Sequence, residues 1–146
     1  MTFLHLLLAA LLGLGAPAPA TAPDPVALLR DWDQRRAEAW ATGDVAGLRH
    51  LYAPDSRAGA TDVAMLRAWR ARGLRVVGMR MQLLSVAVRV ATEDRLVLVV
   101  ADRLASAVAL GEGVRRPLPR DTVSVRRIVL VRAGGAWRVE TVTTTD

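Results

Sequence analysis

Three residue types are missing from the sequence altogether: cysteine, lysine and asparagine. The absence of cysteine excludes thiol catalysis, cysteine-ligated zinc, iron–sulfur clusters and a lipidated cysteine anchor. Aromatic residues are also scarce, at 4% of the 146 residues. A chain of this length fits one domain, and it buries enough surface on folding to need neither a disulfide nor a structural metal.

Because lysine is absent, all 20 basic residues are arginine, and the formal net charge is +6. Isoleucine, phenylalanine and tyrosine occur once each, so the arginine content is typical of a high-GC coding bias and does not by itself indicate a basic patch. The arginines are scattered, with adjacent pairs only at residues 35–36, 115–116 and 126–127. The sequence therefore predicts no nucleic-acid partner.

The N-terminal run FLHLLLAALLGLGA, residues 3–16, is uncharged and shorter than the roughly 20 residues of a membrane span. Ala18-Pro19-Ala20 then gives the small-x-small pattern of a signal peptidase site. We predict a signal peptide over residues 1–20, cleaved near Ala20, and a secreted or cell-envelope protein. No basic residue precedes the run, so the alternative is an uncleaved segment that anchors the protein at a membrane.

A short linker over residues 21–25 leads into one domain over residues 26–146. The first part of this domain has helical periodicity, with Asp24 and Pro25 suited to a helix start and Gly43 to a helix end. The predicted helices cover residues 25–42, residues 44–52, and a third segment from Thr61 or Asp62 to Gly73, with a loop over residues 53–60.

The periodicity then changes to that of strands, and Gly134-Gly135 indicates a hairpin. The predicted strands cover residues 74–90, 95–110, 120–132 and 137–145, with a loop over residues 111–119. The first two are far longer than the usual 5–6 residues, so the sheet must twist and curl. The predicted fold is α+β, with three N-terminal helices packed in a curved four-stranded antiparallel sheet.

The stretch WATGD at residues 40–44, Leu48, and LYAPDS at residues 51–56, followed by long strands, resembles the NTF2-like superfamily, close to its SnoaL-like branch. The resemblance covers roughly residues 26–142. It implies a cone-shaped fold with a pocket at its open end, and often a homodimer through the outer sheet face. Members of that superfamily include steroid isomerases, polyketide cyclases, epoxide hydrolases and many pockets without known chemistry.

Asp102 is the first candidate site residue, because it shares a strand face with apolar residues. Those residues are Leu96, Leu98, Val100, Leu104, Val108 and Leu110. A buried carboxylate is costly unless it is paired, and an unpaired one is a candidate general base. Arg36 lies within the apolar stripe of the first helix and is the predicted partner of Asp102, either in an ion pair or beside a ligand anion; the alternative is an arginine that only extends its charged end to solvent.

Asp62 shares a helix face with Leu66 and Trp69, which makes it a candidate for the pocket or for a buried ion pair. The alternative is that an acid in a first helical turn is favoured by the helix dipole without any further role. Three tryptophans are predicted to pack in the core or to form a pocket wall: Trp32, Trp40 and Trp69. His50, the only histidine outside the signal segment, has no second ligand at a suitable spacing, so we predict no metal site. No motif indicates a cofactor.

The sequence therefore predicts a domain that binds a small apolar or weakly anionic molecule, or supports assembly, without catalysis. The alternative is a cyclase or isomerase that uses Asp102 as its acid/base and Arg36 to stabilise an anion. A third class is a partner-binding module that uses the outer face of the sheet.

Overall fold

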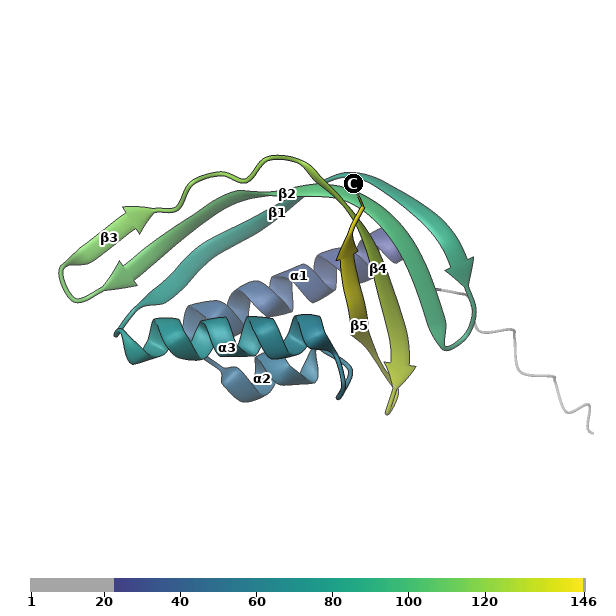
Figure 1. Cartoon of the computed structure of the whole chain (residues 1–146), viewed down its shortest axis with the longest axis horizontal. Coiled ribbons are helices and arrows are strands. Elements are labelled where there is room, and N and C mark those ends of the chain that lie inside the picture. The colour runs from purple at the N-terminus through teal and green to yellow at the C-terminus, as the bar shows by residue number, and fades with distance from the viewer. Residues whose placement is uncertain (1–22, 146) are drawn as a thin grey trace, which may run out of the picture.

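In the computed structural model, which describes residues 23–145, three helices pack against the concave face of one curved antiparallel sheet (Figure 1). The predicted α+β class and helix-then-strand order are confirmed. The predicted signal peptide and its cleavage site lie outside the described residues. Within residues 23–145, no helix combines the length and the apolar character that crossing a membrane requires.

The first two helices, α1 (Pro25–Thr42) and α2 (Val45–His50), follow the predicted signals. The Asp24 side chain accepts a hydrogen bond from the Val26 backbone N–H at 3.0 Å, which satisfies one of the open donors of the first turn of α1. Gly43 ends this helix with a φ of 72°, a conformation that glycine adopts without strain.

The third helix, α3 (Arg57–Ala71), begins earlier than predicted. The Ser56 hydroxyl caps it by accepting a hydrogen bond from the Gly59 backbone N–H at 3.1 Å. A Cβ atom on Gly59 would lie 2.6 Å from the Cβ of Tyr52, so glycine permits the close approach of this first turn. Residues 57–60 were expected in a loop, and the earlier start moves Asp62 out of the first turn. The helix-dipole explanation for Asp62 is therefore wrong.

The sheet has five strands: β1 (Arg75–Ala91), β2 (Arg95–Gly111), β3 (Val114–Pro117), β4 (Ser124–Ala133) and β5 (Ala136–Thr144). Their order is β1-β2-β4-β5, and β3 pairs with the far end of β2. The two long strands curve over the helices (Figure 1). The hairpin between β4 and β5 turns at Gly134 and Gly135, which both have positive φ, as predicted.

The segment between β2 and β4 differs from the prediction, because β3 forms inside the expected loop and β4 begins at Ser124, later than the expected residue 120. Pro117 and Pro119 lack the N–H that a continuous ladder needs. The chain from β3 to β4 instead makes isolated backbone bonds to β2, from Leu118 to Ala107 and from Asp121 to Leu104.

The concave face of β2 follows the predicted alternation only as far as Leu104. Arg80 of β1 lies opposite Ser106 while the next residue, Met81, lies opposite Leu104, so Ala105 is an extra residue in β2. This bulge reverses the alternation, and the buried residues beyond it are Ala107 and Ala109. The prediction that Val108 and Leu110 face the interior was wrong for this reason.

Candidate functional site

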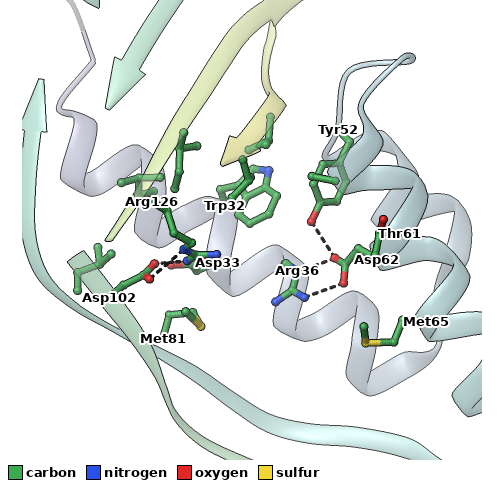
Figure 2. Close-up of a pocket in the computed structure, with 16 residues that line it drawn as sticks. Trp32, Asp33, Arg36, Tyr52, Thr61, Asp62, Met65, Met81, Asp102 and Arg126 are labelled. Atoms are coloured by element: carbon green, nitrogen blue, oxygen red, sulfur yellow. Dashed lines mark hydrogen bonds and ion pairs between the residues drawn. The ribbon is translucent and has the colours of Figure 1, made fainter. Parts of the chain in front are cut away.

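A cavity of about 360 Å³ lies between α1, α3 and the concave face of the sheet (Figure 2). Most of its wall is apolar, and its charged lining residues are three aspartates and two arginines. The lining comprises Leu29, Trp32, Asp33, Arg36, Tyr52, Ala58, Thr61, Asp62, Met65, Met81, Leu83, Asp102, Arg126, Ile128, Val139 and Val142. The predicted site residues Arg36, Asp62 and Asp102 are therefore together at one cavity.

Asp62 on α3 is held by a dense set of donors. The Arg36 guanidinium donates from Nε and Nη2 to the two carboxylate oxygens, both at 2.6 Å. The Tyr52 hydroxyl donates to Oδ2 at 2.8 Å, and the Trp40 indole N–H donates to Oδ1 at 3.2 Å. Four donors satisfy both oxygens of this buried carboxylate, so the geometry gives Asp62 a structural role.

Arg36 and Trp40 reach the same carboxylate because they lie four residues apart on α1, and so project from one face of the helix. The third guanidinium nitrogen of Arg36, Nη1, contacts the Met79 sulfur at 3.3 Å. Tyr52 was noted in the sequence only as the single tyrosine, yet it joins this cluster, and burial raises the pKa of its hydroxyl well above the usual value.

The predicted pair between Asp102 and Arg36 is wrong. Asp102, which is buried in β2, instead binds Arg126 of β4, whose Nε donates to Oδ1 at 3.0 Å and whose Nη2 donates to Oδ2. Arg126 lies directly opposite Val100, so it shares the concave face with Asp102 on the neighbouring strand. The partner of Asp102 thus comes from an adjacent strand, and Arg36 pairs with Asp62 instead.

Asp33 on α1 is, like Arg126 and Tyr52, a site residue that the sequence analysis missed. It lines the cavity between Arg36 and the Asp102–Arg126 pair (Figure 2), and its carboxyl makes no hydrogen bond or ion pair within residues 23–145. Burial raises the pKa of its carboxyl to about 6, and the nearby Asp102 charge acts in the same direction against the lowering effect of Arg36 and Arg126. Its spacing of three residues before Arg36 was a usable signal, because it places both on one helix face.

Of the three tryptophans expected in the core or the pocket wall, only Trp32 is among the lining residues. Its indole N–H donates to the Leu51 carbonyl at 2.8 Å, and its ring meets the Tyr52 ring edge-on at 5.2 Å. Trp40 lies in the core instead, and the half-buried Trp69 packs against it in a T-shaped contact at 6.5 Å. Of the two expectations for these residues, the one that places them with the core is therefore confirmed, and neither lines the cavity.

His50 is exposed on α2, where its Nδ1 contacts the Ala46 carbonyl at 2.8 Å. Over residues 23–145, no three histidine, cysteine, aspartate or glutamate side chains gather in a way that could hold a metal ion.

No family model matches the chain, and no curated protein matches it in sequence. Solved structures match it in fold. The intermembrane space region of the chloroplast protein ARC6 aligns with a TM-score of 0.58 at 13% identity, over 81% of this chain and 91% of that one. The protein Aln2 from a Streptomyces species aligns with a TM-score of 0.54 at 16% identity, over 84% of this chain and 92% of that one.

Structures described as NTF2-like are also among the matches. An NTF2-like protein of unknown function from Rhodospirillum rubrum aligns with a TM-score of 0.49 at 23% identity, over 84% of this chain and 98% of that one. The three helices and the curved sheet, together with the alignments to ARC6 and Aln2, confirm the predicted α+β fold. At such identities the likeness concerns the fold alone, and fold does not determine function.

Proposed function

We propose that this domain binds a small molecule with a largely apolar body in the cavity between α1, α3 and the sheet. The observation that carries the proposal is the cavity itself, a concave apolar site of about 360 Å³ with a few convergent polar groups at its wall. Two of its three carboxylates are neutralised by arginines, so most of the polar lining is already satisfied before a ligand arrives.

The proposal can be tested by filling the cavity from its rim. Met65 lines the cavity and is 49% exposed, so a larger side chain there has room to reach across the opening. Leu84 on β1 is 50% exposed and is not a lining residue, which makes Leu84→Trp a matched control for Met65→Trp.

Each protein would be purified, extracted and analysed for bound small molecules by mass spectrometry, and then titrated with the neutral apolar dye Nile red. We expect the original protein and Leu84→Trp to carry or bind a small molecule, and Met65→Trp to lose it. Equal binding by Met65→Trp, or no binding by the original protein in either assay, would contradict the proposal.

A second candidate function is acid/base catalysis, and Asp33 is the observation that favours it. A carboxylate with a pKa near 6 that pairs with no group among residues 23–145 suits proton abstraction near neutral pH. The Nη1 atom of Arg126 makes no hydrogen bond within residues 23–145 and could donate to a developing oxyanion. Asp102 is less suited than expected, because Arg126 binds both of its oxygens.

This candidate predicts that the protein accelerates exchange of the α-protons of a simple ketone. Exchange of 2-tetralone in deuterated buffer, followed by NMR, should rise through a pH of about 6 as Asp33 ionises. Asp33→Asn should abolish the acceleration, whereas Glu38→Gln, on an exposed position of the same helix, should retain it. An exchange rate equal to that of buffer alone would refute the proposed acid/base catalysis but would not contradict the proposed binding function.

A further inference from the structure

The charges around the cavity do not balance. Three carboxylates line it, from Asp33, Asp62 and Asp102, but only two guanidiniums, from Arg36 and Arg126. Asp62 takes Arg36 and Asp102 takes Arg126, each through two hydrogen bonds. One negative charge, that of Asp33, is therefore left without a partner in this wall when its carboxyl is ionised.

We infer that the ligand of this cavity is an amine, a molecule with an apolar body and one protonated nitrogen that pairs with Asp33. This inference rests on the proposed binding function and names its ligand class. It also revises the expectation of a weakly anionic ligand, because an anion would add a second unpaired negative charge beside the Asp33 carboxylate.

The reason is the water that a ligand displaces. In the empty cavity, solvent reaches the Asp33 carboxyl, whose oxygens are not among the fully buried unpaired atoms of residues 23–145. A neutral ligand that covers Asp33 removes this water and strands the charge, which costs binding free energy. An ammonium group instead makes a charge-assisted hydrogen bond to Asp33 in place of the displaced water, and it neutralises the unpaired charge in the cavity.

The rest of the wall suits the other parts of such a molecule. The rings of Trp32 and Tyr52 meet edge-on at the cavity, and aromatic faces attract cations. Trp32 already donates its indole N–H to Leu51, so it offers mainly its apolar surface. Met65, Met81 and Leu83 provide adaptable apolar contacts for the body of the ligand.

Charged groups surround Asp33 on its own helix and on the neighbouring strands. Arg36 on its own helix and Arg126 on β4 favour the ionised carboxyl, and Asp102 on β2 opposes it. Asp62 and Tyr52 are bound within the Arg36 cluster. Arg30 and Arg80 border a neighbouring groove that Asp33 also lines, but both are exposed and neither forms an ion pair with Asp33.

The experiment compares three probes of nearly equal size: 1-naphthylmethylamine, 1-naphthylmethanol and 1-naphthoic acid. Their dissociation constants are measured by isothermal titration calorimetry at pH 7.5 and pH 5. At pH 7.5 we expect the amine to bind at least about tenfold more tightly than the alcohol, and the acid to bind most weakly. At pH 5, one unit below the pKa of about 6, Asp33 is mostly protonated, and amine affinity should fall about tenfold.

Asp33→Asn should remove both the preference for the amine and its pH dependence, whereas Glu38→Gln, with the same change of net charge on the same helix, should keep both. Circular dichroism checks that each variant is folded. Alcohol binding as tight as amine binding, or a preference that survives in Asp33→Asn, would overturn the amine inference while leaving the binding function intact. Failure of all three probes to bind would count against both.

Discussion

We predict that Asp62 contributes strongly to stability, because its one carboxylate accepts hydrogen bonds from three side chains. Replacing Asp62 by asparagine leaves the Arg36 guanidinium, only 23% exposed, without its counterion. Breaking a buried ion pair by removing one partner typically costs about 3–5 kcal/mol. The Tyr52 and Trp40 hydrogen bonds weaken at the same time, at about 1 kcal/mol each when a neutral bond is lost.

Some of this loss is offset, because the asparagine oxygen still accepts one or two of the four bonds. We therefore expect Asp62→Asn to lower the free energy of unfolding by about 3–5 kcal/mol, a large fraction of the roughly 5–15 kcal/mol that holds a typical domain together. With a urea m-value of about 1.5 kcal/mol/M, the midpoint of unfolding should fall by about 2–3 M.

The matched control is Asp31→Asn. Asp31 pairs with Arg35 on the same helix at 3.0 Å, but the two side chains are 57% and 62% exposed. Such a surface pair contributes at most about 1 kcal/mol, so this variant should unfold almost like the original protein. A double variant, Asp62→Leu with Arg36→Met, should recover part of the loss because it removes both charges together. A loss below about 1 kcal/mol for Asp62→Asn would refute the reasoning.

The remaining predictions concern Asp33, the Asp102 pair, the outer sheet face and the N-terminus. Because the pKa of Asp33 is raised from 3.8 to about 6, the folded protein binds more protons than the unfolded one between these values, so stability falls as pH rises through that window. Asp33→Asn should therefore increase the free energy of unfolding by about 1–3 kcal/mol at pH 7.5 and by almost nothing at pH 3.5. An equal effect at both pH values in urea unfolding would contradict the prediction. Asp102→Asn should lower the free energy of unfolding by about 3–5 kcal/mol. A double-mutant cycle of Asp102→Asn with Arg126→Met should give a larger coupling energy than the cycle of Asp102→Asn with Arg36→Met. We expect the domain to form a homodimer through the convex face of the sheet, where Val125 is 40% exposed beside Ala101. The Val125→Glu variant should then sediment as a monomer. A parent protein that is itself monomeric would contradict this prediction. Cleavage near Ala20 stays a prediction, which the intact mass of exported protein, beginning near Thr21, would verify; a membrane-bound protein that retains Met1 would refute it.

Much of the fold could be predicted from the sequence because its signals are local. The caps Asp24 and Gly43 delimit α1, and the alternation of apolar residues marks the long strands. The bulge at Ala105 could not be predicted, because it depends on the pairing of β2 with β1 and leaves no composition signal of its own.

The site was predicted only in part, because Asp33, Tyr52 and Arg126 were missed and the pairing of the charged groups was wrong. Arg36, Asp62 and Asp102 each lie on an apolar face, and this pattern alone brings them to the interior. Which carboxylate meets which guanidinium depends on strand register, which places Arg126 opposite Val100, and on the early start of α3. Neither is encoded in the spacing of the acids and arginines along the chain.

The extra residue at Ala105 also determines which changes of chain length β2 can accept. Beyond it the interior receives the small side chains of Ala107 and Ala109, while Val108 and Leu110 point the other way. Deleting one residue at the bulge would turn Val108 and Leu110 toward the interior in place of the two alanines. Each larger side chain in the filled core would typically cost about 1–3 kcal/mol of stability. A homologue that lacks this residue would therefore need small side chains at the alternate positions. We therefore expect the bulge and the alanines after it to be gained or lost together among related sequences.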